Sequence, residues 1–150
     1  MAAFERQPRT LAHETSEFEF RHFVRQHFDS PPASCGVVAN AEGTSGANVR
    51  RFTLQVKDRL RKDWDRRWLV TFYLAATSGG DPSAAGNTVA IVTGVTSRVV
   101  LANAWYEVLT DASGLVVFDV TIAGAASRFV VAGVGGWFDE FGGTSGFAWT

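Results

Sequence analysis

The side chains best suited to covalent chemistry lie near the start of this chain. Its single cysteine, Cys35, and its three histidines all fall within the first 35 residues. A thiol beside His22 or His27 could act as a nucleophile whose proton the imidazole removes. Pro31 and Pro32 separate both histidines from the cysteine, and such a segment would hold the two groups together poorly. We therefore expect Cys35 to serve as a small apolar residue of the fold.

The acidic residues do not predict a metal centre or a pair of catalytic carboxylates. Asp63, Asp65 and Asp111 could offer oxygen ligands to calcium, but they fall in separate loops without the spacing of an EF-hand. Asp139 and Glu140 are adjacent, so on a strand their side chains would face opposite sides. Glycoside hydrolysis needs two carboxylates opposed across a cleft, and no such pair is indicated. We expect no enzymatic activity, no metal and no cofactor.

The densest charge lies at 57–67, where six basic and three acidic residues surround Trp64. We expect a solvated loop in which opposite charges pair. The alternative is a loop that contacts another protein through Trp64, because Trp and Arg are frequent interface hot spots. The formal net charge of the chain is −1, without the basic excess typical of nucleic-acid binding. Nucleic acid is therefore not an expected partner.

Aromatic residues are the most numerous candidates for binding. The chain has 12 Phe and 5 Trp, more large rings than one small core requires, so some are expected to contact partners. The candidate interface residues are Phe18, Phe20, Phe23, Phe28, Trp64, Trp137, Phe138, Phe141 and Trp149. Those near the C-terminus lie in a glycine-rich tail that is not expected to form a further regular strand. Either this tail wraps over its own domain or it packs on a neighbouring subunit.

These residues belong to two parts of the chain: an N-terminal docking arm with its linker at 1–48, and a β-sandwich with its aromatic tail at 49–150. Within the arm, 15–28 is expected to be a short helix, because Ser16 and Glu19 form a capping box and apolar residues recur at helical spacing. A strand is the alternative, since phenylalanines in this segment also alternate with charged residues. The arm cannot bury its rings internally, so they must pack on the sandwich or on a neighbour.

The second part has the pattern of an all-β domain. Apolar and polar residues alternate through short segments separated by turn residues, with no helical period. Seven strands are expected, at 52–57, 68–75, 88–93, 98–101, 105–110, 115–122 and 128–134. Asp111 and Gly114 define a tight turn that would join the fifth and sixth of these strands as a hairpin. This succession is typical of an antiparallel β-sandwich.

Three features bear on the cellular compartment. The start of the chain meets charge at Glu5 without a preceding apolar run, so no signal peptide is expected. The stretch 115–136 is interrupted by Asp119 and Arg128, which indicates two strands and no membrane span. A lone cysteine suits a reducing compartment such as a cytoplasm.

Several segments together resemble a known module. Phe-Thr-Leu-Gln-Val-Lys-Asp at 52–58, Arg-Trp-Leu-Val at 67–70 and Gly-Asn-Thr-Val at 86–89 are followed by Thr-Asp-Ala-Ser-Gly-Leu-Val-Val at 110–117. They resemble the immunoglobulin-like module of structural proteins of tailed bacteriophages, found in head fibres, capsid decorations and tail-associated proteins. The resemblance spans roughly residues 49–135. The chain lacks the inter-sheet cysteine pair of antibody domains, so the likeness to those domains is one of architecture.

The resemblance implies a virion protein without enzymatic activity, a capsid decoration or a head fibre, that docks to the particle through its N-terminal arm. Its partners would be capsid or tail subunits. A homo-oligomer, with a trimer expected by analogy, would assemble in the cytoplasm of the bacterial host. The alternative is a tail-associated adhesion module that binds carbohydrate or a receptor on the host surface. In that case Trp64, Trp105 and Trp137 would be stacking platforms at loop ends.

Overall fold

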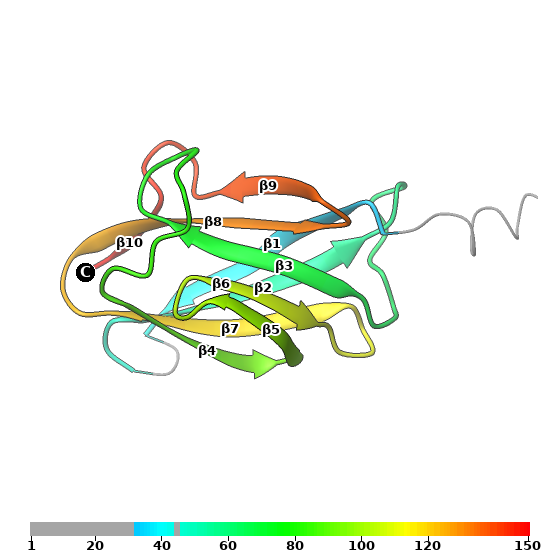
Figure 1. Ribbon diagram of the computed structural model, residues 1–150, viewed down its shortest axis with the longest axis horizontal. Helices are drawn as coiled ribbons and strands as arrows, with labels where there is room; N and C mark the ends of the chain where they lie inside the picture. The colour runs from blue at the N-terminus through cyan, green and yellow to red at the C-terminus, as the bar shows by residue number, and fades with distance from the viewer. Residues whose placement is uncertain (1–31, 44–45) are drawn as a thin grey trace, which may run out of the picture. The chain divides into compact units, whose positions relative to one another are not determined.

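Every regular element that the structure describes is a β-strand (Figure 1). The computed structural model describes residues 32–43 and 46–150, so the helix expected at 15–28 lies outside the described residues. The strands are β1 (Ser34–Glu42), β2 (Val49–Lys57), β3 (Leu69–Ala75), β4 (Asn87–Thr93), β5 (Val95–Leu101), β6 (Trp105–Leu109), β7 (Leu115–Ile122), β8 (Ala126–Val134), β9 (Trp137–Phe141) and β10 (Phe147–Trp149). Within the described part of the chain, no helix has the length and apolar character needed to cross a bilayer.

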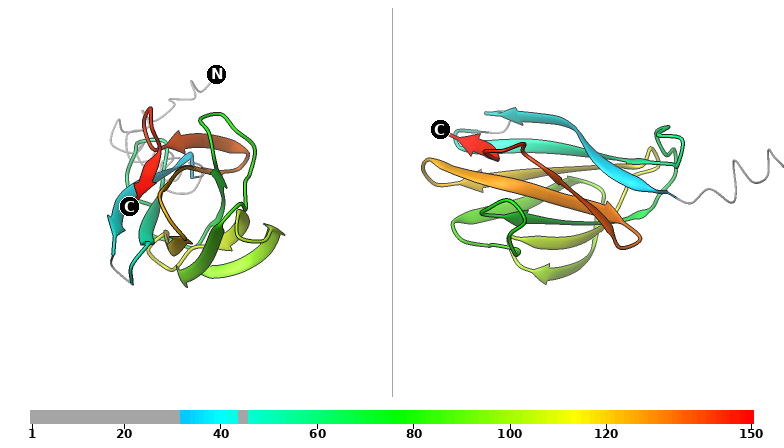
Figure 2. Two further views of the ribbon diagram at one scale, coloured as in Figure 1. Left: turned by 90° about the vertical axis from the view of Figure 1, so that its left-hand side faces the viewer. Right: turned by 90° about the horizontal axis from the view of Figure 1, so that it is seen from above.

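The strands form two antiparallel sheets, which confirms the expected all-β class. The four-stranded sheet has the order β1-β2-β7-β4. The six-stranded sheet has the order β10-β8-β3-β6-β5, and β9 also pairs with β8. When the molecule is viewed from one end, the strands of both sheets enclose a common interior (Figure 2).

A stack of aromatic rings joins the two sheets. Phe72 of β3 lies on Phe118 of β7, with ring centroids 4.1 Å apart and planes 15° from parallel. Phe52 of β2 stacks on the same Phe118 at 5.3 Å, and Tyr106 of β6 stacks on Phe72 at 5.6 Å. Alternation along the strands produces this arrangement, because every second side chain faces the opposite sheet. In β7, buried and partly exposed positions alternate throughout.

Each of the seven expected segments contains a strand, but three further strands make the expected count too low. Two of these, β9 and β10, lie in the tail for which the sequence indicates no regular strand, and that expectation is wrong. β9 forms because Gly135 and Gly136, with φ of 60° and 87°, make a two-residue turn that returns the chain along β8. The third, β1, uses residues that the expected division assigns to the arm and linker.

The expected hairpin at the Asp111 turn is also wrong. β6 pairs with β3 and β5, whereas β7 pairs with β2 and β4, so the chain crosses between sheets at this turn. The turn itself has the expected chemistry, because the Asp111 carboxylate accepts hydrogen bonds from the amides of Ser113 and Leu115 at 2.8 and 2.9 Å. Gly114 has a φ of 72°. The amide of Val56 in β2 donates to the carbonyl of Gly114 at 3.0 Å, which directs β7 onto β2.

Three outer strands carry β-bulges, whereas the pairings between inner strands are regular. An extra residue interrupts the register of β1 at Val38, of β4 at Val92, and of β5 at Ser97 and Val100. The pairings of β2 with β7 and of β3 with β6 and β8 have no such interruption. Val38 and Val92 occupy two of these bulges, and both are exposed.

The C-terminal strand completes the core. Trp149 of β10 is 1% exposed, and its indole Nε1 donates a hydrogen bond to the carbonyl of Val120 at 3.2 Å. The guanidinium of Arg50 lies over this ring, 5.4 Å from the centroid, and forms an ion pair with Glu42 at 2.8 Å. Trp149, a candidate interface residue, therefore belongs to the protein's own interior, and the end of the tail wraps over its own domain.

Unfolding experiments can test that Trp149 is buried and Trp137 is exposed. Trp149→Ala removes a buried ring and its hydrogen bond, so it should lower the free energy of unfolding by about 3–5 kcal/mol. Trp137 is 79% exposed and is the matched control, because Trp137→Ala should change that free energy by less than ~0.5 kcal/mol. Urea denaturation followed by circular dichroism measures both variants. Equal effects would contradict the assignment of Trp149 to the core.

Candidate functional site

An open pocket lies between β1 and β9, outer strands that belong to different sheets. Its volume is about 540 Å³, and its walls come from β1, from the charged loop after β2, and from Asp139 and Phe141 of β9. Among the described strands, no hydrogen-bonded pairing joins β1 to β9, so the sandwich is open between them. Concave sites of this size are typical of small-molecule binding.

The wall formed by the charged loop is organised by Asp58. Its carboxylate accepts hydrogen bonds from the amides of Leu60 and Lys62 at 2.7 and 3.0 Å. Its carbonyl accepts from the amide of Arg61 at 3.1 Å, and its own amide donates to the carbonyl of Lys62 at 3.0 Å. These bonds close a three-residue turn whose last residue is Arg61. That residue has a φ of 61°, the left-handed conformation for which glycine is the usual choice.

Some of the charged side chains around the pocket have partners within the protein and others do not. Lys57 forms an ion pair with Asp63 at 2.7 Å, and the carboxylate of Asp58 is occupied by the loop amides. Within the described residues, neither the guanidinium of Arg61 nor the carboxylate of Asp139 has a hydrogen bond or an ion pair. Two lining cations, Arg61 and Arg59, and one anion, Asp139, are therefore open to a ligand.

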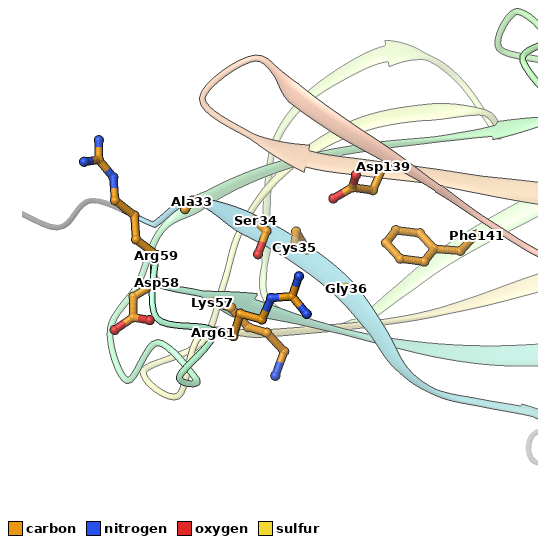
Figure 3. Close-up of a pocket in the computed structure, with 10 residues that line it drawn as sticks. All are labelled: Ala33, Ser34, Cys35, Gly36, Lys57, Asp58, Arg59, Arg61, Asp139 and Phe141. Carbon is orange, nitrogen blue, oxygen red and sulfur yellow. The ribbon is translucent and has the colours of Figure 1, made fainter.

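Three side chains gather around the middle of the pocket, as Figure 3 shows. Arg61 from the loop, together with Asp139 and Phe141 from β9, surrounds Cys35, whereas the side chain of Arg59 points away from them. A guanidinium, a carboxylate and an aromatic ring thus border the same space. This combination suits the binding of a small polar molecule that also has an apolar surface.

The surroundings of the Cys35 thiol disfavour its nucleophilic form, the thiolate. The side chain is buried in the core, and this burial, followed by the negative charge of Asp139, raises the pKa of the thiol from 9.0 to about 12. The thiol is therefore protonated at neutral pH, whereas nucleophilic cysteines have a lowered pKa. His22 and His27, its imagined partners, lie outside the described residues.

The candidate interface residues do not gather on one surface of the described structure. Trp137 is 79% exposed and Phe138 is 44% exposed, so both are open to a partner. Phe141 lines the pocket and packs partly on the core, and Trp149 lies inside. The remaining candidates of the arm lie outside the described residues: Phe18, Phe20, Phe23 and Phe28.

Trp64, the candidate in the charged loop, is held by its own surroundings. Its ring meets that of Trp68 edge to face, with centroids 6.1 Å apart, and packs against the core. The guanidinium of Arg66 lies over the ring at 6.0 Å from its centroid. Trp64 is therefore partly buried against its own domain.

Tyr73 is a surface residue that the sequence analysis does not single out. Its ring lies between those of Trp105 and Phe138, at centroid distances of 6.0 and 6.3 Å. All three side chains face outward from the six-stranded sheet, and the alternation of buried residues in β3 is the signal that could have found Tyr73. The ring planes are inclined by 56° and 52°, so the rings pack on one another and form no flat platform.

Comparisons with known proteins give no relative from which to transfer a function. No family model matches the sequence, and no curated protein or solved structure gives a significant match. The fold and the pocket define only a structural class: an all-β protein of two antiparallel sheets with an open pocket at their edges.

Because the pKa of Cys35 is raised in the folded protein, the free energy of unfolding should decrease as the pH rises through the alkaline range. Because the folded state disfavours the thiolate, this contribution to stability is lost as the pH rises from 9.0 towards about 12. In this window the free energy of unfolding should fall more steeply than in Cys35→Ala, by up to ~1.4 kcal/mol per pH unit. Urea denaturation of both proteins across this range measures the difference, and the comparison cancels the titration of Tyr and Lys. Parallel curves would show that the thiol is not buried.

Proposed function

We propose that this protein is a structural component of a tailed-bacteriophage virion, a capsid decoration or head-fibre protein that docks to the particle through its N-terminal arm. Its partners are other virion subunits, including further copies of itself. The resemblance of residues 49–135 to phage structural modules supports this proposal. The protonated, buried thiol of Cys35 supports a role in binding without catalysis.

The observation that carries the proposal is apolar surface left open on the six-stranded sheet. Four of the large apolar residues that are exposed in the described part of the chain face outward from this sheet: Leu69, Val95, Leu101 and Phe138. The register sets Leu69, Leu109 and Val95 side by side on three neighbouring strands. Grouped apolar residues that stay exposed in a folded protein are typical of contacts with other proteins. We assign the outer face of this sheet to contacts between neighbouring subunits.

The strand layout supports an immunoglobulin-like form of sandwich. The positions β1-β2-β7-β4 and β9-β8-β3-β6-β5 correspond to the ABED and GFCC′C″ sheets of variable-type immunoglobulin domains. The chain fills three of these positions in reversed order. After β3 it occupies the D position with β4, then C″ with β5 and C′ with β6. The likeness is therefore one of layout, and the reversed segment departs from the family pattern.

Docking through the arm can be tested in the full chain by replacing Phe18, Phe20, Phe23 and Phe28 together with alanine. If these rings anchor the protein, co-sedimentation with phage capsid or tail assemblies should weaken by at least about 100-fold, because several aromatic hot spots are lost at once. Circular dichroism should show an intact sandwich. Val92→Ala, on the opposite sheet, is a control that should leave attachment unchanged. Normal attachment of the arm variant would overturn the proposal.

A second candidate function is a tail-associated adhesion module that binds carbohydrate or a receptor, and the pocket with its unpaired charges favours it. The three tryptophans expected to form its platforms do not come together. Trp64 is covered by its own loop, and Trp105 and Trp137 lie on strands separated by β3 and β8. Their register positions also differ by three residues, roughly 10 Å along the strands. An adhesion site would therefore use the pocket.

A further inference from the structure

We propose that the pocket between β1 and β9 binds a carboxylated sugar unit of a surface polysaccharide, with Arg61, Asp139 and Phe141 as its contacts. The inference rests on the second candidate function and names the ligand class that such a module would recognise. It is argued from the three side chains that border the pocket and from the turn that holds one of them.

Arg61 supplies the contact for the carboxylate. A guanidinium presents parallel N–H donors that match the two oxygens of a carboxylate, and no described residue occupies those of Arg61. The left-handed backbone of Arg61, with φ of 61°, is strained for a residue with a Cβ. Glycine or asparagine would suit this turn better. A role for the guanidinium in the pocket explains why arginine stands there.

Asp139 supplies the contact for hydroxyl groups. An ionised carboxylate only accepts hydrogen bonds, so it recognises donors, and sugar hydroxyls are such donors. Asp139 and Arg61 line one pocket of about 540 Å³ and yet form no ion pair with each other. A ligand that carries both a carboxylate and neighbouring hydroxyl groups can satisfy the two side chains at once.

Phe141 and Trp137 supply the apolar surface. Side chains at 137, 139 and 141 share one face of β9, because the period of a strand is two residues. Asp139 and Phe141 line the pocket, and Trp137, which is 79% exposed, is the next residue on the same face of β9. One face of a pyranose ring carries mainly C–H groups, which pack favourably on aromatic rings. A sugar in the pocket would thus lie on Phe141, and the adjoining unit of its chain would meet Trp137.

The three contacts together select against other small ligands. A neutral sugar would leave the guanidinium of Arg61 without an anion. Inorganic phosphate would bring a negative charge towards Asp139 and would leave the ring of Phe141 unused. A free amino acid such as glycine carries a carboxylate and an ammonium group but no apolar ring face. A carboxylated pyranose matches all three groups.

The test is a titration of the full chain with sodium glucuronate, sodium galacturonate and N-acetylneuraminate, followed by NMR. At least one of these acids should shift the resonances of the pocket. Glucose should bind at least about 10-fold more weakly, because it lacks the hydrogen-bonded charge pair with Arg61. Glycine and phosphate should also bind more weakly, because they have no apolar ring face to pack on Phe141. No shift with any acidic sugar, or equal binding of glucose, glycine or phosphate, would overturn the inference.

Variants of the two loop arginines separate binding from folding. Arg61→Asn places a residue that tolerates the left-handed conformation in the turn, so the protein should keep or gain thermal stability. Its affinity for the acidic sugar should fall by about 10-fold or more. Arg67→Asn removes an exposed guanidinium of the same loop that does not line the pocket, so it should leave the affinity unchanged. Undiminished binding by Arg61→Asn, or an equal loss in both variants, would overturn the role of Arg61.

The failure of this inference can be told apart from the failure of the adhesion function. The full chain and its Arg61→Asn variant are applied to immobilised alginate, a polymer of uronic acids, and to host cells. Retention of the full chain but not of the variant supports the pocket as the site. Equal retention of both refutes the pocket and leaves the adhesion function standing. Retention of neither protein on either surface refutes both.

Discussion

The stack of Phe72 on Phe118 is the contact on which the rest of the structure depends. These rings come from inner strands of opposite sheets, so the stack fixes which faces of β3 and β7 turn inward. Because side chains alternate along a strand, the same choice turns Tyr73 outward and places Asp119 on the outer face of the other sheet, where it pairs with Arg51 at 2.7 Å. The outer strands β1 and β9 lie side by side at the edges of the two sheets without pairing, and the pocket lies between them.

The sequence predicts the strands of this fold well and their partners poorly. Alternation is a property of neighbouring residues, so it locates the inner strands, whereas pairing depends on residues far apart in the chain. The Asp111 turn illustrates the difference, because its internal hydrogen bonds follow from local chemistry while its direction is set by Val56 in β2. β9 is harder still to predict. Most of its residues are exposed, so burial leaves no period in its sequence, and the turn at Gly135 and Gly136 is the signal that remains.

The candidate site was predictable only in outline. Trp137 and Phe138 are exposed, but an excess of aromatic residues in the sequence does not distinguish Trp137 from Trp149, which both lie in the same glycine-rich tail. That distinction depends on a hydrogen bond to Val120, a residue of a distant strand. The pocket is formed by a loop and a strand that are remote in the sequence. The local sequence feature that points to it is Arg61, an arginine at a turn position that suits glycine. The role of the aromatic arm stays a prediction from the sequence.

The bulges in β1, β4 and β5 limit how these outer strands can pair with the strand of another chain. A regular outer strand offers an unbroken row of amide and carbonyl groups that another strand can extend, whereas a bulged strand twists and breaks that row. Continuous ladders from one molecule to the next are therefore disfavoured along these three strands. The bulges thus protect three edges of the sandwich from growth into amyloid-like ladders, whereas β9 pairs regularly with β8 and carries no such break.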